Sequence, residues 1–266
     1  MSLPVYASNQ IPCNKKPPSE IKINPLWEYS KFSKIFTGSS FLYYTSKIPK
    51  NHIIAINAGH GTKNGSSFKT LCHPDGSPKT TGGSTKKGEI YACAVSGGMM
   101  FPNGISEATV NLKVAKIIKE ILLNNGYDVL MIRNDDDVQL DNIARTVIAN
   151  HYADAHISIH FDAGEKDKGA FYLSVPNEIK EMMPVKNYWK MHNKLGKDLI
   201  EGLKDVGIKI FGKGNLDIDL TQTSYSTIPS VDIELGDQGS DVSDKILKIM
   251  GEGLMKGIDK FFKDCK

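Results

Sequence analysis

The chain has 266 residues, of which 40% are hydrophobic and 24% charged, as in an ordinary folded globular protein. Its formal net charge is only +3, and its lysines and arginines are scattered among acidic residues, which argues against a nucleic-acid partner. No apolar run approaches the roughly 20 residues of a membrane-spanning helix. This length accommodates one sizeable domain together with a smaller segment.

The first 50 residues mix polar and aromatic residues with little periodicity. We predict an N-terminal extension over 1–50 that packs on the following domain, with a separate binding appendage as the alternative. Residues 5–7 (Val-Tyr-Ala) resemble the small-x-small end of a secretory signal without its apolar part. This favours an exported protein over one with an ordinary cytosolic N-terminus.

The four cysteines are Cys13, Cys72, Cys93 and Cys265, and no two of them form a C-x-x-C pair. This spacing disfavours a zinc knuckle or a thioredoxin-like motif. If the protein is exported, one disulfide between Cys72 and Cys93 is possible, but the sequence does not give the connectivity.

The pattern of hydrophobic residues changes near residue 51, and we predict a single domain over 51–266. Residues 53–56 are apolar and run into Asn57-Ala58-Gly59-His60-Gly61, as expected for a buried strand followed by a glycine turn. A polar insertion rich in Gly, Ser, Thr and Lys follows at about 62–104. It reads as a long loop with weak strand character at 89–95.

After the insertion, strands and helices alternate. Ser106 is a good N-cap, apolar residues recur at helical spacing from there to Leu122, and Gly126 supplies a stop. Further strands are predicted at 127–132, 155–159, 170–175 and 231–235, and helices at 140–152, 189–206 and 242–262. The alternation predicts a single α/β domain with a mostly parallel twisted sheet covered by helices on both faces.

Four side chains with metal or acid–base chemistry are expected at one edge of this sheet. His60 follows the first strand of the domain, His160 ends another, Glu107 begins a helix, and Glu234 lies near the end of the last strand. Sites in such sheets form at the carboxyl ends of the strands. Two imidazoles and carboxylates suit a catalytic zinc ion, which takes three protein ligands and leaves a position for water. A structural role for each histidine is the alternative.

The other histidines fit this site less well. His156 lies about 13 Å from His160 along an extended strand, too far for both to bind one ion. His52 is separated from His60 in the same way, and His151 and His192 fall on predicted helices. His73, in the insertion, is the remaining rival ligand.

Several motifs occur in order along the chain. They are Asn57-Ala58-Gly59-His60-Gly61, Ser106-Glu107 with Asn111-Leu112, Gly126-Tyr127-Asp128-Val129 with Arg133, Arg145 with Ala149-Asn150, Ala153-Asp154 leading to Ser158-Ile159-His160, and Asp232-Ile233-Glu234-Leu235-Gly236. Together they resemble the zinc-dependent N-acetylmuramoyl-L-alanine amidases of the amidase type 3 family, the autolysin-like cell-wall hydrolases. The resemblance covers about residues 52–262.

The resemblance implies a role for each of the four side chains. It assigns His60, Glu107 and His160 as ligands of one zinc ion and Glu234 as the catalytic glutamate, with peptidoglycan as the substrate. It also implies a secreted or wall-associated protein, and a protein activator is left open. The chain departs from the family at 57–58, at 161–163 and, after the glutamate, at 235–241. None of these departures removes a ligand, and the last two alter the groove rim.

Two alternative functions of the protein, and alternative roles of several residues, are compatible with these motifs. The alternatives to amidase activity are a zinc carboxypeptidase or aminopeptidase and a catalytically silent wall-binding regulator. An ion pair with Arg145 is the alternative for Glu234, although Arg145 is expected mainly to brace the loops. Asp162 is expected either to orient a metal ligand or to contact the peptide of the substrate. A further alternative is that the insertion brings His73 or Asp75 near the metal.

Overall fold

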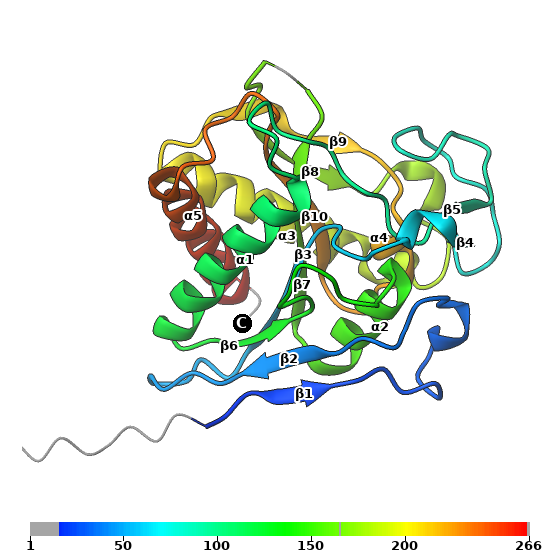
Figure 1. Cartoon of the computed structure of the whole chain (residues 1–266), viewed down its shortest axis with the longest axis horizontal. Helices are drawn as coiled ribbons and strands as arrows, with labels where there is room; N and C mark the ends of the chain where they lie inside the picture. The colour runs from blue at the N-terminus through cyan, green and yellow to red at the C-terminus, as the bar shows by residue number, and fades with distance from the viewer. Residues whose placement is uncertain (1–15, 165, 265–266) are drawn as a thin grey trace, which may run out of the picture.

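The computed structural model describes residues 16–164 and 166–264. Eight strands form one central sheet in the order β1-β2-β6-β3-β7-β10-β8-β9 (Figure 1). The strands are β1 (Ser19–Ile21), β2 (Ser40–Tyr43), β3 (Ile53–Ala58), β6 (Asp128–Met131), β7 (Ala155–Asp162), β8 (Ala170–Ser174), β9 (Ile210–Asp217) and β10 (Ser230–Asp237). The four central strands β6, β3, β7 and β10 are parallel, as are β8 and β9. Antiparallel pairings join β1 to β2, β2 to β6 and β8 to β10.

Helices cover both faces of this sheet. Figure 1 shows α1 (Glu107–Asn124), α3 (Val185–Asp205) and α5 (Asp244–Lys263) on one side, and α2 (Asn142–Tyr152) and α4 (Thr221–Tyr225) on the other. Short 3₁₀ helices span Ser30–Phe32, Gly65–Ser67 and Asn177–Ile179. The predicted α/β fold with a mostly parallel sheet is confirmed. No helix in the described part of the chain combines the length and the apolar character needed to cross a membrane.

The helix starts follow from capping chemistry. The Ser106 side chain accepts a hydrogen bond from the Thr109 backbone N–H at 3.2 Å, so α1 begins where the sequence predicts. Asp141 caps α2 by accepting the Ala144 N–H at 2.8 Å. Because Ser106 fixes the first turn of α1, Glu107 stands at the carboxyl edge of the sheet.

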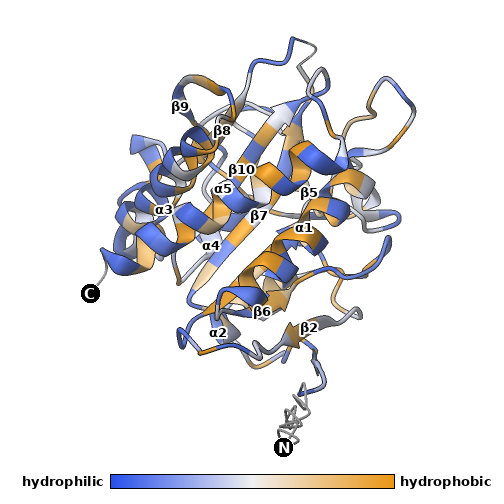
Figure 2. Cartoon of the chain, turned by 90° about the vertical axis from the view of Figure 1, so that its left-hand side faces the viewer, coloured by the Kyte–Doolittle hydropathy of each residue, from blue (hydrophilic) through white to orange (hydrophobic). Residues whose placement is uncertain are grey.

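The main core lies between the sheet and the helices α1, α3 and α5. On β7, Ala155, Ile157 and Ile159 belong to this core. Side chains alternate along a strand, so His156, Ser158 and His160 point to the opposite face, toward α2 and the insertion. Figure 2 shows the apolar colouring of the central strands and a mixture of apolar and polar residues along α1.

The N-terminal segment contributes to the sheet and to its cover. β2 pairs with β6, and Trp27 stacks on His151 of α2 with ring centroids 4.1 Å apart. Tyr29 and Phe32 pack edge-on against Tyr225 of α4. These aromatic residues therefore pack against side chains of α2 and α4. The division of the chain at residue 50 stays a prediction, and residues 5–7 lie outside the described part.

The insertion folds into a small two-stranded sheet of β4 (Lys69–Leu71) and β5 (Tyr91–Cys93). In this register the Cys72 N–H donates to Ile90 O, which places Cys93 three residues, about 10 Å, further along the partner strand. A disulfide needs Cα atoms less than about 7 Å apart. Both cysteines are free thiols, so the Cys72–Cys93 disulfide considered from the sequence is wrong. Cys13 and Cys265 lie outside the described residues.

Two buried histidines make the fold sensitive to acid. His192 of α3 accepts the Ser230 backbone N–H at its Nδ1, 2.9 Å away, and His156 of β7 is also fully buried. Burial lowers the pKa of each to about 3, and the positive charge of Arg145 adds to the effect at His156. The unfolded chain, with pKa values near 6.5, therefore binds protons that the folded chain excludes.

We expect these histidines to stabilise the fold fully above pH 6.5 and to lose that contribution as the pH falls toward 3. In that interval each of the two histidines should lower the free energy of unfolding by up to about 1.4 kcal/mol per pH unit of acidification. Urea unfolding at pH 7, 6 and 5 measures the slope, which should be shallower for His192→Gln than for the wild type. The exposed His151→Gln is the control. Equal slopes for the wild type and His192→Gln would contradict this account.

Candidate active site at the carboxyl edge of the sheet

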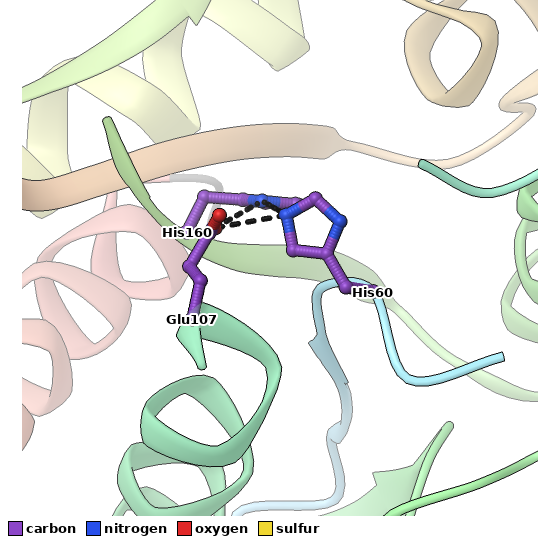
Figure 3. A group of neighbouring side chains, drawn as sticks. All are labelled: His60, Glu107 and His160. Carbon is purple, nitrogen blue, oxygen red and sulfur yellow. Dashed lines mark hydrogen bonds and ion pairs between the residues drawn. The ribbon is translucent and has the colours of Figure 1, made fainter. Parts of the chain in front are cut away.

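Three side chains from separate elements meet at the carboxyl edge of the sheet (Figure 3). His60 follows β3, Glu107 opens α1 and His160 lies in β7. Glu107 Oε1 is 2.9 Å from His60 Nε2 and 3.0 Å from His160 Nδ1, and the two ring nitrogens are 3.1 Å apart. Two nitrogens and one carboxylate oxygen therefore point at one another from distant parts of the chain, as in a metal-ligand set.

Two buried arginines hold the turn that carries His60. Arg145 donates to the His60 carbonyl at 2.7 Å and to the Ala58 carbonyl at 3.3 Å. Arg133 donates to the carbonyls of Ala58 and Gly59 at 3.1 and 3.2 Å. These bonds fix the turn although His60 itself has a left-handed φ of 62°. The bracing role predicted for Arg145 is confirmed.

Gly59 leaves the space that the second imidazole occupies. A Cβ at Gly59 would lie 2.2 Å from Cε1 of His160, a distance at which one of them must move. Glycine in the His60 turn is thus required by the close approach of β7, and not only by the turn itself.

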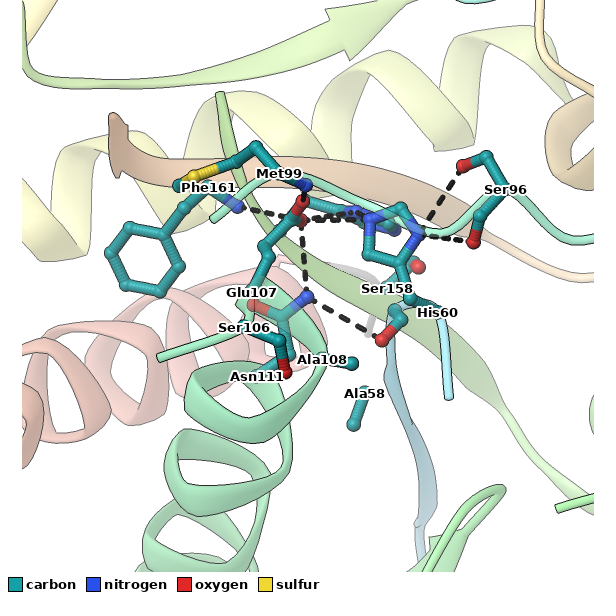
Figure 4. Close-up of polar contacts among 12 residues, drawn as sticks. Ala58, His60, Ser96, Met99, Ser106, Glu107, Ala108, Asn111, Ser158 and Phe161 are labelled. Carbon is teal, nitrogen blue, oxygen red and sulfur yellow. Dashed lines mark hydrogen bonds and ion pairs between the residues drawn. The ribbon is translucent and has the colours of Figure 1, made fainter. Parts of the chain in front are cut away.

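Glu107 is buried and almost fully hydrogen-bonded (Figure 4). Its Oε1 accepts the Phe161 N–H and the Asn111 side-chain amide, both at 3.2 Å, and its Oε2 accepts the Met99 N–H at 3.0 Å. Burial raises the pKa of Glu107, but the neighbouring imidazoles of His160 and His60 outweigh this effect and hold the pKa well below its usual range. Glu107 is therefore a carboxylate at neutral pH.

The His60 ring is oriented by the insertion. Its Nδ1 lies 2.8 Å from the Ser96 carbonyl oxygen, which only accepts hydrogen bonds, so Nδ1 carries the proton and donates it (Figure 4). The lone pair is then on Nε2, the nitrogen that faces Glu107 and His160. His60 is in the tautomer that binds a cation through Nε2.

The site carries an excess of negative charge. Burial lowers the pKa of His160, but Asp232, Glu107 and Glu234 outweigh it and raise that pKa to about 10. Within residues 16–164 and 166–264, no lysine or arginine forms an ion pair with any of these three carboxylates. A divalent cation would neutralise this charge, and the donor set of two imidazoles and a carboxylate fits one.

Glu234 lies beside this group on β10, in register with His160 of β7. Its Oε2 is buried and has no hydrogen-bond partner among the described residues. Burial raises the pKa of Glu234 well above its usual range, and the charges of Asp232 and Glu107 raise it further. The alternative ion pair with Arg145 is wrong, because each guanidinium nitrogen of Arg145 bonds elsewhere.

A cleft of about 570 Å³ opens over these groups. One wall comes from the insertion, at Gly82–Ser84 and Gly97–Met99, and another is apolar. The apolar wall consists of Phe171, Leu173, Leu216, Ile218 and Leu220. Asp162 also lines the cleft and pairs with Lys168. The cleft is large enough to admit an extended substrate to the metal-ligand set.

The insertion is fixed over the cleft by one buried carboxylate. Asp219 accepts hydrogen bonds from the backbone N–H groups of Thr80 and Thr81 at 2.7 and 3.0 Å, and pairs with Lys79 at 3.0 Å. His73 Nε2 lies 3.1 Å from the same carboxylate, and its other ring nitrogen contacts Ser77 Oγ. His73 therefore has a structural role. The side chain of Asp75 accepts a hydrogen bond from the Ser77 backbone N–H. Neither belongs to the ligand group, so the option that the insertion supplies a ligand is wrong.

Asp232 is the residue of this site to which the sequence analysis gave no role. It precedes Glu234 by two positions, lies on the same face of β10 and has its Oδ2 3.6 Å from His160 Nε2. The signal that could have found it is the strand period of two, because a strand with Glu234 facing the site must also turn Asp232 to that face.

The fold and the donor set together define a hydrolase-type site at the carboxyl edge of an α/β sheet. A family model described as "N-acetylmuramoyl-L-alanine amidase" matches residues 54–248. The chain therefore belongs to the Amidase_3 family, enzymes that hydrolyse the amide bond between N-acetylmuramic acid and L-alanine in peptidoglycan. The family indicated by the sequence motifs is confirmed. No curated protein sequence matched this chain.

Solved structures of amidases share the fold. The Ami1 amidase of Mycobacterium smegmatis is similar with a TM-score of 0.63 at 18% identity, over 82% of this chain and 100% of that one. Ami1 of Mycobacterium abscessus gives 0.61 at 19%, over 80% and 99%. The CwlD amidase of Clostridioides difficile, solved in complex with the GerS lipoprotein, gives 0.55 at 19%, over 80% and 100%. At these identities the likeness concerns the fold.

Proposed function

We propose that this amidase is zinc-dependent and that His60, Glu107 and His160 hold the ion. The observation that carries this proposal is the mutual spacing of the three donor atoms, 2.9–3.1 Å. A tetrahedral zinc site with bonds of about 2.0–2.1 Å has ligand atoms about 3.3 Å apart, so a small outward adjustment suffices. Three protein ligands leave a fourth position for water or substrate.

Zinc suits this donor set better than harder cations. Mg²⁺ and Ca²⁺ take oxygen ligands, whereas imidazole nitrogen with one carboxylate is typical of catalytic zinc. Zinc would act as a Lewis acid at the substrate carbonyl and would lower the pKa of water toward about 7.

Glu234 is proposed as the general base and acid of the reaction. A carboxylate oxygen of Glu234 lies within 4.8 Å of a ring nitrogen of His160, and its Oε2 has no hydrogen-bond partner among the described residues. The raised pKa of Glu234 suits a group that both takes up and releases a proton. Glu234 takes one proton from the water that attacks the lactyl carbonyl of the muramic acid. It returns that proton to the nitrogen of L-alanine as the C–N bond breaks, so that carboxylic acid and free amine are formed.

We propose that the enzyme is secreted or wall-associated, because its peptidoglycan substrate lies outside the cytoplasmic membrane. The apolar wall of the cleft offers contacts for the stem peptide beside the reacting amide. The complex of CwlD with the GerS lipoprotein supports the proposal that this chain, too, has a protein partner.

Digestion of purified peptidoglycan sacculi tests the proposal. We expect the zinc-loaded enzyme to release stem peptides with a new N-terminal alanine, detectable by mass analysis, and a chelator to abolish the release until zinc is restored. A zinc peptidase would instead cleave free peptides, and a silent wall-binding protein would release nothing. Release that persists in the metal-depleted enzyme would overturn the metal proposal.

A further inference from the structure

Asp232 carries a largely buried carboxylate with almost no bonding partners. Its side chain is 13% exposed, and its Oδ1 has no hydrogen-bond partner among the described residues. Its Oδ2 lies 3.6 Å from His160 Nε2, the sole ion-pair contact of Asp232 in residues 16–164 and 166–264. Leaving a buried carboxylate this poorly bonded costs free energy, so its presence calls for a role outside stability.

His160 has two ring nitrogens with different surroundings. Nδ1 lies in the ligand group, 3.0 Å from Glu107 and 3.1 Å from His60. Nε2 is directed away from that group and toward Asp232. A histidine that binds a metal through one nitrogen commonly donates the N–H of the other to a carboxylate or a carbonyl, which fixes the tautomer and the ring plane. For His60 the Ser96 carbonyl accepts this bond, and Asp232 stands at the corresponding place for His160.

We propose that Asp232 is a positioning residue that accepts the Nε2–H of His160 and so presents the Nδ1 lone pair to the metal. This inference rests on the zinc site of the proposed function. The 3.6 Å separation exceeds a hydrogen bond. A cavity of about 180 Å³, lined in part by Asn57, Ser158 and Asp232, gives the carboxylate room to move. No hydrogen bond described for Asp232 would have to break for it to close on His160.

The negative charge strengthens the effect on the ligand. A carboxylate that accepts the N–H of an imidazole makes the opposite nitrogen a better electron donor. His60, with a neutral carbonyl partner, lacks this effect. Asp232 thus acts on the metal through His160, and it takes no part in proton transfer to the substrate.

The test measures zinc affinity by competition with a chromophoric chelator for the wild type, Asp232→Ala and Asp232→Asn. We expect Asp232→Ala to bind zinc about 10–100-fold more weakly. Asp232→Asn should lose less, because its amide oxygen still accepts the N–H. Asp198→Asn, a buried carboxylate on α3 that pairs with Lys194, is the matched control and should bind zinc as the wild type does.

Two further readouts separate positioning from a structural role. ¹⁵N NMR of the zinc-loaded protein should show His160 protonated at Nε2 in the wild type, with that signal shifted in Asp232→Ala. The metal-free Asp232→Ala protein should melt at the same temperature as the wild type or higher, since an unpaired buried carboxylate is removed.

The outcomes distinguish this inference from the zinc proposal. If the wild type takes up no zinc, the zinc proposal fails and the role of Asp232 with it. If the wild type binds zinc and Asp232→Ala binds equally well, the inference alone is overturned. Weaker zinc binding by Asp232→Ala with restoration in Asp232→Asn supports it.

Discussion

Replacing Glu234 with glutamine should lower the rate of stem-peptide release by about 10²–10⁴-fold, the usual contribution of a general acid–base group. The amide has the same size and fits the same place on β10, but it cannot take a proton from water. Purified sacculi and mass analysis of the released peptides measure the effect at equal enzyme concentration.

The same variant should keep its zinc, because Glu234 is outside the proposed ligand set. We also expect it to be at least as stable as the wild type, since a buried carboxylate oxygen without a partner is replaced by a neutral group. Glu201→Gln is the control and should turn over normally, because Glu201 is a half-buried residue of α3 that pairs with Lys260 on α5, away from the site. Undiminished release by Glu234→Gln would remove Glu234 from the mechanism.

Replacing His160 with alanine should abolish both zinc binding and release of stem peptides. One of three ligands is lost. The affinity for zinc should therefore fall by more than the roughly 10–100-fold that is lost when a residue hydrogen-bonded to a ligand is removed. The substitution suits the backbone, because His160 lies in a regular strand paired on both sides of β7. Retained activity or zinc would exclude the proposed ligand set.

Thermal and urea unfolding provide an activity-independent measure of the lost ligand. Zinc at 1,000 times its Kd should stabilise the wild type by about 4 kcal/mol, and the same zinc concentration should stabilise His160→Ala far less. His52→Ala is the matched control, because His52 lies just before β3, at the opposite end of that strand from His60. It should show the full stabilisation by zinc.

Local patterns predict most of the central domain. The helix expected after Ser106 is α1, and the strands expected at 155–159 and 231–235 are the cores of β7 and β10. These elements have strong periodicity and a cap, which are local properties of the sequence. The same patterns place His60, Glu107, His160 and Glu234 at the ends of elements.

The elements that the sequence analysis missed depend on distant partners. β2 of the N-terminal segment exists because β6 offers an open edge, and its four residues carry little pattern of their own. β9 has mostly exposed or half-buried residues and is a strand because it pairs with β8. Such edge strands are decided by tertiary pairing more than by propensity.

By itself, the sequence determined the class of fold, the family and the four residues that carry the proposed chemistry, because each follows from a local motif and from the order of strands and helices. Only the tertiary structure decided which groups touch. The 2.9–3.1 Å spacing of the donor atoms, the partner of each imidazole, the isolation of Asp232 and the separation of Cys72 from Cys93 all depend on strand register and loop packing. These arise from contacts between residues tens of positions apart, and a shift of one residue in register would turn each strand side chain to the other face.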